Sequence, residues 1–322
     1  MNKRPKGQST RPHSTIVPNG KQDFTVVDRI QGTLVRIDYP VDQTAPLVVA
    51  SPHSGRVYSA EFLEQSRLDH MRLRSSEDSF VEEIFGTAPL LGAPLVQALF
   101  PRVYIDVNRE AYELDPDMFS DDLPEHAVTR NSRIAAGLGT IAKVVSNAET
   151  VYREKLTFDE AEQRIFRHYR PYHKALSALL DETRDKFGYC ILLDCHSMPS
   201  GAAIHGRKQQ NQGTDNDIVL GDCHGTSCGA LVIAEAERAL RAMGYTVRRN
   251  KPYAGGFVTQ HYGRPLNGIH ALQIELNRNL YMDEARLSRT QQIECVIGHM
   301  AELIQTLGNL DNPNVAIGEA AE

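Results

Sequence analysis

The stretch CILLDCHS, residues 190–197, carries the strongest structural signal in the chain. Its apolar beginning, Cys190–Asp194, predicts a buried strand, and the polar Cys195-His196-Ser197 that follows marks the end of that strand. The apolar run Leu47–Ala50 ends in the same way, on a loop of small residues that contains His53. Both histidines therefore come directly after buried strands.

Strands and helices alternate along the rest of the chain. This alternation favours one α/β domain with a mixed, mainly parallel twisted sheet covered by helices on both faces. In such a sheet, ligands bind beyond the carboxyl ends of the strands. The other expected strands are Leu95–Leu99, Val103–Val107, Asp217–Leu220 and Ala271–Leu276, and the expected helices are Ser76–Leu91, Asp159–Phe187, Gly229–Met243 and Asp283–Leu307.

The composition is that of an ordinary globular protein of 322 residues, with 41% hydrophobic and 24% charged residues. Its net charge of -6 disfavours a nucleic-acid partner, because nucleic-acid binders usually carry a basic face. No apolar run reaches the roughly 18–20 residues of a membrane span. Five scattered cysteines without a CxxC pair indicate reduced thiols in the cytoplasm. We expect a monomer or small homo-oligomer without membrane contacts.

One domain is expected between two tails. Residues 1–23 are rich in Pro, Ser, Gly and Lys, which predicts a disordered tail, and residues 311–322 predict a flexible C-terminal tail. The N-terminus lacks the apolar core of a secretory signal. No linker composition interrupts residues 24–310, so this range is predicted to form a single catalytic domain.

Two histidines at strand ends match part of a catalytic zinc site, which takes three protein ligands and leaves a fourth position open. Asp78 and Glu77, at the start of an expected helix, and His224 are candidates for the third ligand. Simpler roles also fit these residues: a hydrogen-bonded loop position for each histidine, and a helix cap for the two acids. On the residues alone, the cap is the favoured interpretation for Asp78 and Glu77.

Glu275 lies near the end of an apolar strand, where a carboxylate is costly to bury unless it is paired or functional. Beside a metal, this carboxylate can take a proton from water and pass it to a leaving nitrogen. The structural alternative is a buried ion pair with Arg278 or Arg109.

Asn108-Arg109 follows another expected strand and suits a substrate carboxylate, because a guanidinium group binds carboxylates bidentately. The alternative is a structural pair between Arg109 and Asp106 or Glu110. The glycine-rich stretch 255–263 is typical of a mobile loop over a site, and its Thr259 is a candidate substrate contact.

Six segments together resemble the N-formylglutamate amidohydrolases, also called N-formylglutamate deformylases. The similarity runs from about residue 45 to 305, and the motifs are specific in combination. They are SPHSG at 51–55, SSEDSFVEEIF at 75–85, RVYIDVNRE at 102–110, LLDCHSMPS at 192–200, DIVLGDCHGTS at 217–227 and QIELNRNLYMDE at 273–284.

The resemblance implies a zinc-carboxypeptidase-like (phosphorylase/hydrolase-like) fold with a mixed eight-stranded sheet. It implies that His53 and His196 are metal ligands. The carboxypeptidases supply their acidic ligand as HxxE, but Arg56 occupies that position here, so Asp78 is the expected third ligand. One divalent metal per chain is expected, zinc first, with cobalt or manganese as alternatives.

The resemblance also implies the reaction, which is hydrolysis of N-formyl-L-glutamate to formate and L-glutamate, a final step of histidine degradation. Glu275 is then the general acid and base, Asn108-Arg109 the carboxylate clamp, and Arg102 a stabiliser of the developing oxyanion. The alternatives are a deacylase or carboxypeptidase-like hydrolase of another N-acyl amino acid, and a non-catalytic metal-binding or regulatory protein.

Overall fold

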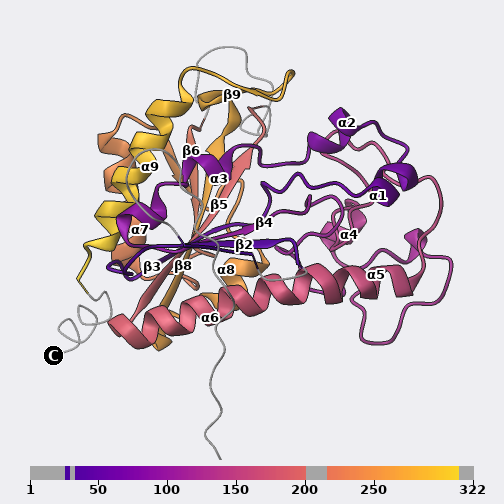
Figure 1. Ribbon diagram of the computed structural model, residues 1–322, viewed down its shortest axis with the longest axis horizontal. Coiled ribbons are helices and arrows are strands. Elements are labelled where there is room, and N and C mark those ends of the chain that lie inside the picture. The colour runs from indigo at the N-terminus through magenta and orange to yellow at the C-terminus, as the bar shows by residue number, and fades with distance from the viewer. Residues whose placement is uncertain (1–25, 30–32, 201–215, 312–322) are drawn as a thin grey trace, which may run out of the picture.

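The computed structural model describes residues 26–29, 33–200 and 216–311, which fold around one eight-stranded sheet (Figure 1). The strand order is β1-β2-β4-β3-β5-β8-β6-β7. The central block β4-β3-β5-β8 is parallel, whereas β1, β2 and β6 introduce antiparallel pairings. This sheet confirms the predicted mixed, mainly parallel architecture. The strands are β1 Val26–Arg29, β2 Val35–Tyr39, β3 Leu47–Ser51, β4 Leu95–Ala98, β5 Cys190–Met198, β6 Ile218–Gly221, β7 Val247–Arg249 and β8 Ile269–Asn277.

Helices cover both faces of the sheet, and this explains why its central strands are buried throughout. Every residue of β3, β5 and β8 is buried, as expected for strands with helices on both sides. Helices α7 (Ala230–Ala242) and α9 (Ile293–Gly308) pack on one face, in the same apolar cluster as Leu47 and Val49 of β3. Helix α6 (Arg170–Phe187) packs on the other, against Val48 and Ala50.

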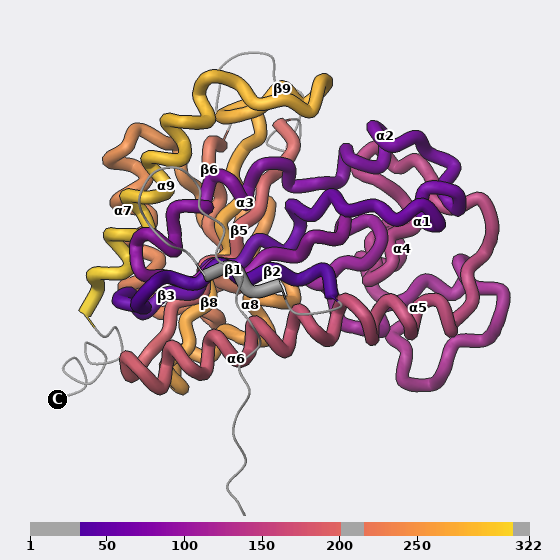
Figure 2. Tube along the Cα trace, in the orientation of Figure 1, coloured from indigo at the N-terminus to yellow at the C-terminus, as the bar shows by residue number. Residues whose placement is uncertain are grey.

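A side lobe, residues 58–74 and 103–164, lies beside the sheet and has its own apolar cluster around Phe62 and Leu114 (Figures 1 and 2). It joins the sheet through a continuous helical run from α5 across a π-helical turn into α6, which confirms the long helix expected at Asp159–Phe187. The lobe contains α1 Ala60–Gln65, α2 His70–Arg74, α4 Ser132–Ala135 and α5 Phe158–Arg164. The remaining short elements are α3 Val81–Ile84, α8 Phe257–Tyr262, β9 Met282–Asp283, β10 Ser288–Arg289 and 3-10 turns at Ala88–Leu91, Pro116–Met118, Pro265–Asn267 and Arg278–Leu280.

One expected element is wrong, and two expected helices are shorter than predicted. Val103–Val107 is not a strand, because Tyr104 and Ile105 donate their backbone N–H groups back to the carbonyl of Pro101 and form a turn. The helix expected at Ser76–Leu91 is short, since Phe80 has a left-handed φ of 69° that separates α3 from the preceding turn. The helix expected from Asp283 begins only at Ile293, after the β9–β10 hairpin.

The two expected tails lie almost entirely outside the described residues, namely 1–23 and 312–322. Among the described helices, none is long and apolar enough to cross a membrane. All five cysteines are free thiols.

Candidate metal centre and active site

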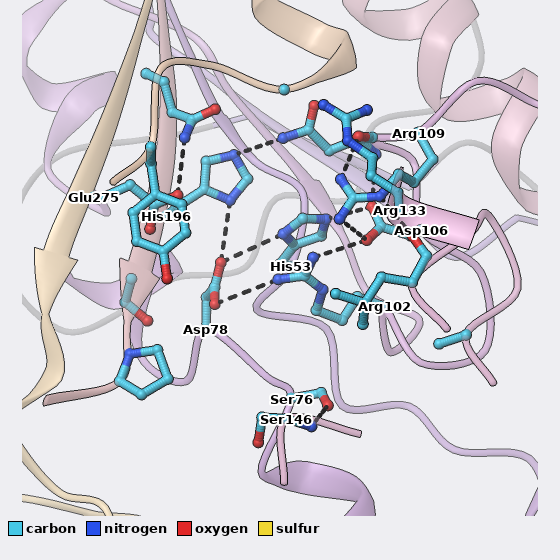
Figure 3. A pocket seen from close by; sticks show the side chains of 18 of the residues that line it. His53, Ser76, Asp78, Arg102, Asp106, Arg109, Arg133, Ser146, His196 and Glu275 are labelled. Carbon is cyan, nitrogen blue, oxygen red and sulfur yellow. Dashed lines mark hydrogen bonds and ion pairs between the residues drawn. The ribbon is translucent and has the colours of Figure 1, made fainter. Parts of the chain in front are cut away.

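His53, Asp78 and His196 meet at the carboxyl edge of the parallel strands (Figure 3). His196 belongs to β5, and His53 follows the neighbouring strand β3, so parallel pairing brings the two rings to the same edge. Asp78 precedes α3, and its backbone N–H donates to the carbonyl of His53 at 3.0 Å. The three residues are at most 2% exposed, and one ligand atom from each lies within 4.8 Å of the others.

The Nδ1 atoms of both rings face the same carboxylate oxygen. Asp78 Oδ2 lies 3.1 Å from His196 Nδ1 and 3.4 Å from His53 Nδ1, and the ring centroids are 4.7 Å apart. His53 Nδ1 is buried without a hydrogen-bond partner among the described residues, although buried polar atoms are normally satisfied. His53 Nδ1, His196 Nδ1 and Asp78 Oδ2 therefore converge on one point, and this set of two nitrogens and one oxygen could hold a metal ion.

A second carboxylate orients each ring from behind. His53 Nε2 lies 2.7 Å from Asp106 Oδ1, and His196 Nε2 lies 3.1 Å from Asp194 Oδ1. A carboxylate on the far ring nitrogen fixes the tautomer and turns the near nitrogen toward a metal. Asp194, in the middle of β5, and Asp106, which the sequence indicated only as an arginine partner, are therefore positioning residues that sequence analysis missed.

The charges of this group depend on one another. Burial disfavours a charged Asp78, yet His196, His53 and Arg102 together hold the pKa of its carboxyl well below the usual range. Burial likewise disfavours a charged His196, but Asp194 and Asp78 raise the pKa of this ring well above its ordinary value. The centre therefore has an ionised carboxylate and a histidine that holds its proton tightly when no cation is bound.

The other candidates for the third ligand lie elsewhere. The Glu77 carboxylate accepts hydrogen bonds from Tyr58 at 2.8 Å, from Arg74 at 3.0 Å and from Ser79. His224 is exposed on the loop after β6. The geometry therefore groups Asp78, rather than Glu77 or His224, with the two histidines.

Glu275 lies on β8 directly opposite His196 of β5 in the strand register. Its carboxylate accepts a hydrogen bond from Gln273 Nε2 at 2.9 Å, and no cationic side chain of the described residues lies within 4.0 Å of it. Arg278 and Arg109, the partners expected for a structural ion pair, bind other groups. Burial raises the pKa of Glu275 to about 7, a value suited to taking up and releasing a proton near neutral pH.

A cavity of about 640 Å³ opens over these residues. Arg102, Arg109 and Arg133 gather on its His53 side, and Glu275 lies across it beside His196 (Figure 3). Arg102 donates to Asp106 Oδ2 at 2.8 Å. The cavity thus combines a cationic wall with a buried carboxylate on the opposite wall.

The glycine-rich stretch 255–263 differs from its expectation, because residues 257–262 form helix α8 rather than a loop. Thr259 does not line the cavity: it is fully buried and donates its hydroxyl to the carbonyl of Gly256 at 3.0 Å. Asn108 does line the cavity, but its amide is occupied by the backbone N–H of Val258 at 2.8 Å and by His196 Nε2 at 3.2 Å. Asn108 thus ties α8 to the centre.

Comparison with known proteins gives a consistent assignment. A sequence model of the family "N-formylglutamate amidohydrolase" matches residues 45–282. The chain is 32% identical over 243 residues to an N-formylglutamate deformylase of Pseudomonas putida, covering 74% of this chain and 82% of that protein. It is 28% identical over 270 residues to an N-formylglutamate deformylase of Pseudomonas aeruginosa, covering 81% and 92%.

Solved structures agree with these relatives. The N-formylglutamate amidohydrolase of Ralstonia eutropha superimposes with a TM-score of 0.80 at 36% identity, covering 86% of this chain and 97% of that one. A gene product of Agrobacterium tumefaciens shares the fold, with a TM-score of 0.60 at 16% identity and coverage of 90% and 97%. On the family match and the Pseudomonas putida relative, this chain belongs to the N-formylglutamate amidohydrolase family.

Proposed function

We propose that the protein hydrolyses N-formyl-L-glutamate to formate and L-glutamate, a final step of histidine degradation, in the cytoplasm. The observation that carries this proposal is the buried His53–Asp78–His196 group, which lies beside Glu275 under a cavity with an arginine-rich wall. The names of the relatives supply the substrate. The five free thiols favour a reducing compartment.

One zinc ion per chain, with cobalt or manganese as alternatives, is the cofactor that we propose for this group. Two imidazole nitrogens and one carboxylate oxygen are zinc's usual ligands, and tetrahedral bonds of roughly 2.0–2.1 Å separate neighbouring ligand atoms by about 3.3 Å. The distances of 3.1 and 3.4 Å from Asp78 Oδ2 to the two Nδ1 atoms fit that spacing. When bound, the metal polarises the formyl carbonyl and lowers the pKa of water.

Glu275 is proposed to move the proton. Its carboxylate accepts a proton from the attacking water as the water oxygen bonds to the formyl carbon. The same proton then passes to the glutamate nitrogen as the C–N bond breaks, which releases formate and L-glutamate. The hydrogen bond from Gln273 at 2.9 Å holds the carboxylate for both steps.

Arg102 and Arg109 are proposed to bind the negative charges of the reaction. Arg102 lines the cavity beside Asp78, with 3.9 Å between its Nη1 and Asp78 Oδ1, where a guanidinium can stabilise the developing oxyanion. Arg109 is held by the carbonyls of Leu138 and Asn108, both at 2.8 Å. Its remaining nitrogen, Nη2, makes no hydrogen bond within the described residues and lies 4.0 Å from Asp106 Oδ2, and we propose that it binds the substrate α-carboxylate.

A substrate panel tests the proposal. Purified, zinc-loaded protein is assayed for hydrolysis of N-formyl-L-glutamate, N-acetyl-L-glutamate and a dipeptide that ends in glutamate. We expect the formyl substrate to have the highest kcat/KM. Equal or faster hydrolysis of the acetyl compound or the peptide would favour a broader deacylase or a carboxypeptidase instead. Hydrolysis of none of them would exclude the proposed reaction.

A further inference from the structure

We propose that Arg133 binds the side-chain carboxylate of the substrate and thereby makes the enzyme selective for acidic N-acyl amino acids. This inference rests on the proposed function, because N-formyl-L-glutamate carries two carboxylates and Arg109 accounts for only one of them. A second cationic anchor is therefore required within the same cavity.

Arg133 is the cavity arginine whose guanidinium is least committed to the protein. Arg102 donates to Asp106 at 2.8 Å, and Arg278 donates to Ser197, Asp78 and two backbone carbonyls. Arg109 makes the two carbonyl contacts already described. Within the described part of the chain, the Arg133 guanidinium makes no hydrogen bond, and its nearest acid is Glu113, with 4.0 Å between Nη1 and Oε2.

The charges around the cavity favour an anion at this position. The Asp106 carboxylate offsets Arg102, and the Asp78 carboxylate offsets Arg278. Burial lowers the pKa of Arg109, the nearby Asp106 and Glu113 carboxylates raise it, and the positive charges of Arg102 and Arg133 lower it. Arg109 and Arg133 are therefore two neighbouring cations, and neither is hydrogen-bonded to a carboxylate of the described residues. A dicarboxylate substrate would supply one carboxylate to each of them.

Local structure holds Arg133 in place. It lies in α4, whose first turn is capped by Asn131, with the side-chain oxygen accepting the backbone N–H of Ile134 at 2.8 Å. Ile134 is buried, which anchors this short helix to the side lobe. Arg133 lines the cavity next to Arg109 and is 34% exposed, so an incoming anion can reach it (Figure 3).

The acidic neighbour of each arginine indicates which carboxylate of the substrate that arginine binds. In N-formyl-L-glutamate, the α-carboxylate is attached to the carbon next to the scissile nitrogen, whereas the side-chain carboxylate lies two methylene groups further away. Arg109 lies 4.0 Å from Asp106, which touches His53. Arg133 instead lies toward Glu113 in the side lobe. Arg109, which neighbours the carboxylate that touches His53, therefore fits the α-carboxylate, and Arg133 fits the side-chain carboxylate.

The test compares three substrates that differ in one charge each: N-formyl-L-glutamate, N-formyl-L-glutamine, and the α-amide of N-formyl-L-glutamate. We expect Arg133→Gln to lower kcat/KM for N-formyl-L-glutamate by about 10- to 100-fold, the usual effect of losing a hydrogen-bonded ion pair. The variant should no longer prefer N-formyl-L-glutamate to N-formyl-L-glutamine. It should still prefer N-formyl-L-glutamate to the α-amide. Arg133→Lys should restore part of the loss.

Arg130→Gln is the matched control, because Arg130 is an exposed arginine three residues earlier that does not line the cavity. It should behave like the parent. If Arg133→Gln keeps its discrimination against N-formyl-L-glutamine, the inference is wrong. It is also wrong if discrimination against the α-amide is lost instead.

Calorimetric binding of the same three compounds separates this inference from the proposed function. If the parent turns over none of them, the proposed reaction fails. Binding of N-formyl-L-glutamate in preference to N-formyl-L-glutamine, with that preference removed by Arg133→Gln, would still support the role of Arg133. Equal binding of both compounds by the parent would reject it.

Discussion

At the scale of single residues, the two central histidines are each held between two carboxylates. Asp78 faces both Nδ1 atoms, while Asp106 and Asp194 face the Nε2 atoms. Asp78, the inner carboxylate, is suited to bind a metal together with the two rings. Asp106 and Asp194, the outer carboxylates, are suited to fix the orientation of the rings. Loss of an outer carboxylate should therefore weaken metal binding without removing a ligand.

Asp106→Asn is expected to lower zinc affinity about 10- to 100-fold, the usual effect of changing an outer-shell partner. The amide keeps the size of the side chain but no longer pairs with His53 Nε2 and Arg102 as a charged acceptor. Competition with a metal chelator measures the effect. The control is Asp115→Asn, which changes another buried aspartate that pairs with Lys143 instead. Equal zinc affinity in both variants would contradict the role assigned to Asp106.

Metal uptake should depend on pH in a defined direction. Because the pKa of His196 is raised in the metal-free protein, a proton stays on this ring at pH values where an ordinary histidine has lost it. Zinc must displace this proton, so affinity should fall as pH falls, by up to about tenfold per pH unit for one displaced proton. Zinc titrations between about pH 6 and pH 8 measure this. A flat affinity across that range would contradict it.

Glu275→Gln separates chemistry from structure. The substitution preserves shape and the hydrogen-bonding capacity toward Gln273, so fold and zinc content should be unchanged. Turnover should fall about 10²- to 10⁴-fold, the usual contribution of general acid–base catalysis. Rates, melting curves and metal content are measured on one preparation. A variant that melts early but keeps parental turnover per folded molecule would assign Glu275 a structural role.

At the scale of secondary-structure elements, strand register creates the active site. Parallel pairing of β5 with β8 places His196 opposite Glu275 and Asp194 opposite Gln273. A shift of β8 by one residue would turn Glu275 and Gln273 to the other face of the sheet, away from His196 and Asp194. The apolar residues of β5 and β8, buried on both faces of the sheet, fix that register through packing.

The contact between α8 and the centre leaves no room for a side chain at Gly256. A Cβ there would lie 2.3 Å from the Asn108 amide, which bonds both Val258 and His196. Gly256→Ala should therefore lower stability by about 1–3 kcal/mol and reduce turnover, because the overpacked Asn108 has to move.

Gly298→Ala provides the control, since its Cβ in α9 meets nothing within 4 Å. It should stabilise the protein by about 0.5–1 kcal/mol through helix propensity. Melting curves and rates for both variants test the pair. A Gly256→Ala protein that melts and turns over like the parent would show that the contact is unimportant.

The sequence predicts the strand ends better than it predicts the elements between them. His53, His196 and Glu275 were found because each interrupts or follows a buried apolar run, and this pattern is local. Arg133 has no such signal, because it reaches the cavity only through the placement of the side lobe. The apolar run 103–107 predicts a strand but forms a turn, because a short apolar run indicates burial and does not distinguish a strand from a buried turn.

At the scale of the whole molecule, the sheet and the side lobe contribute different parts of the site. The sheet edge supplies the histidines and Glu275, and the lobe supplies Arg133. This division assigns selection of the side-chain carboxylate to α4. Substitutions at Arg133 should alter specificity with little effect on metal binding, because Arg133 does not touch the His53–Asp78–His196 group.

Zinc titration of metal-stripped protein, read out as formate release from N-formyl-L-glutamate, tests the central claim most directly. The account predicts that stripped protein is inactive and that activity rises linearly with added zinc up to about one equivalent per chain, the stoichiometry of a single three-ligand site. A His196→Ala variant should not recover activity. Parental turnover by fully stripped protein, or full recovery by His196→Ala, would contradict the account.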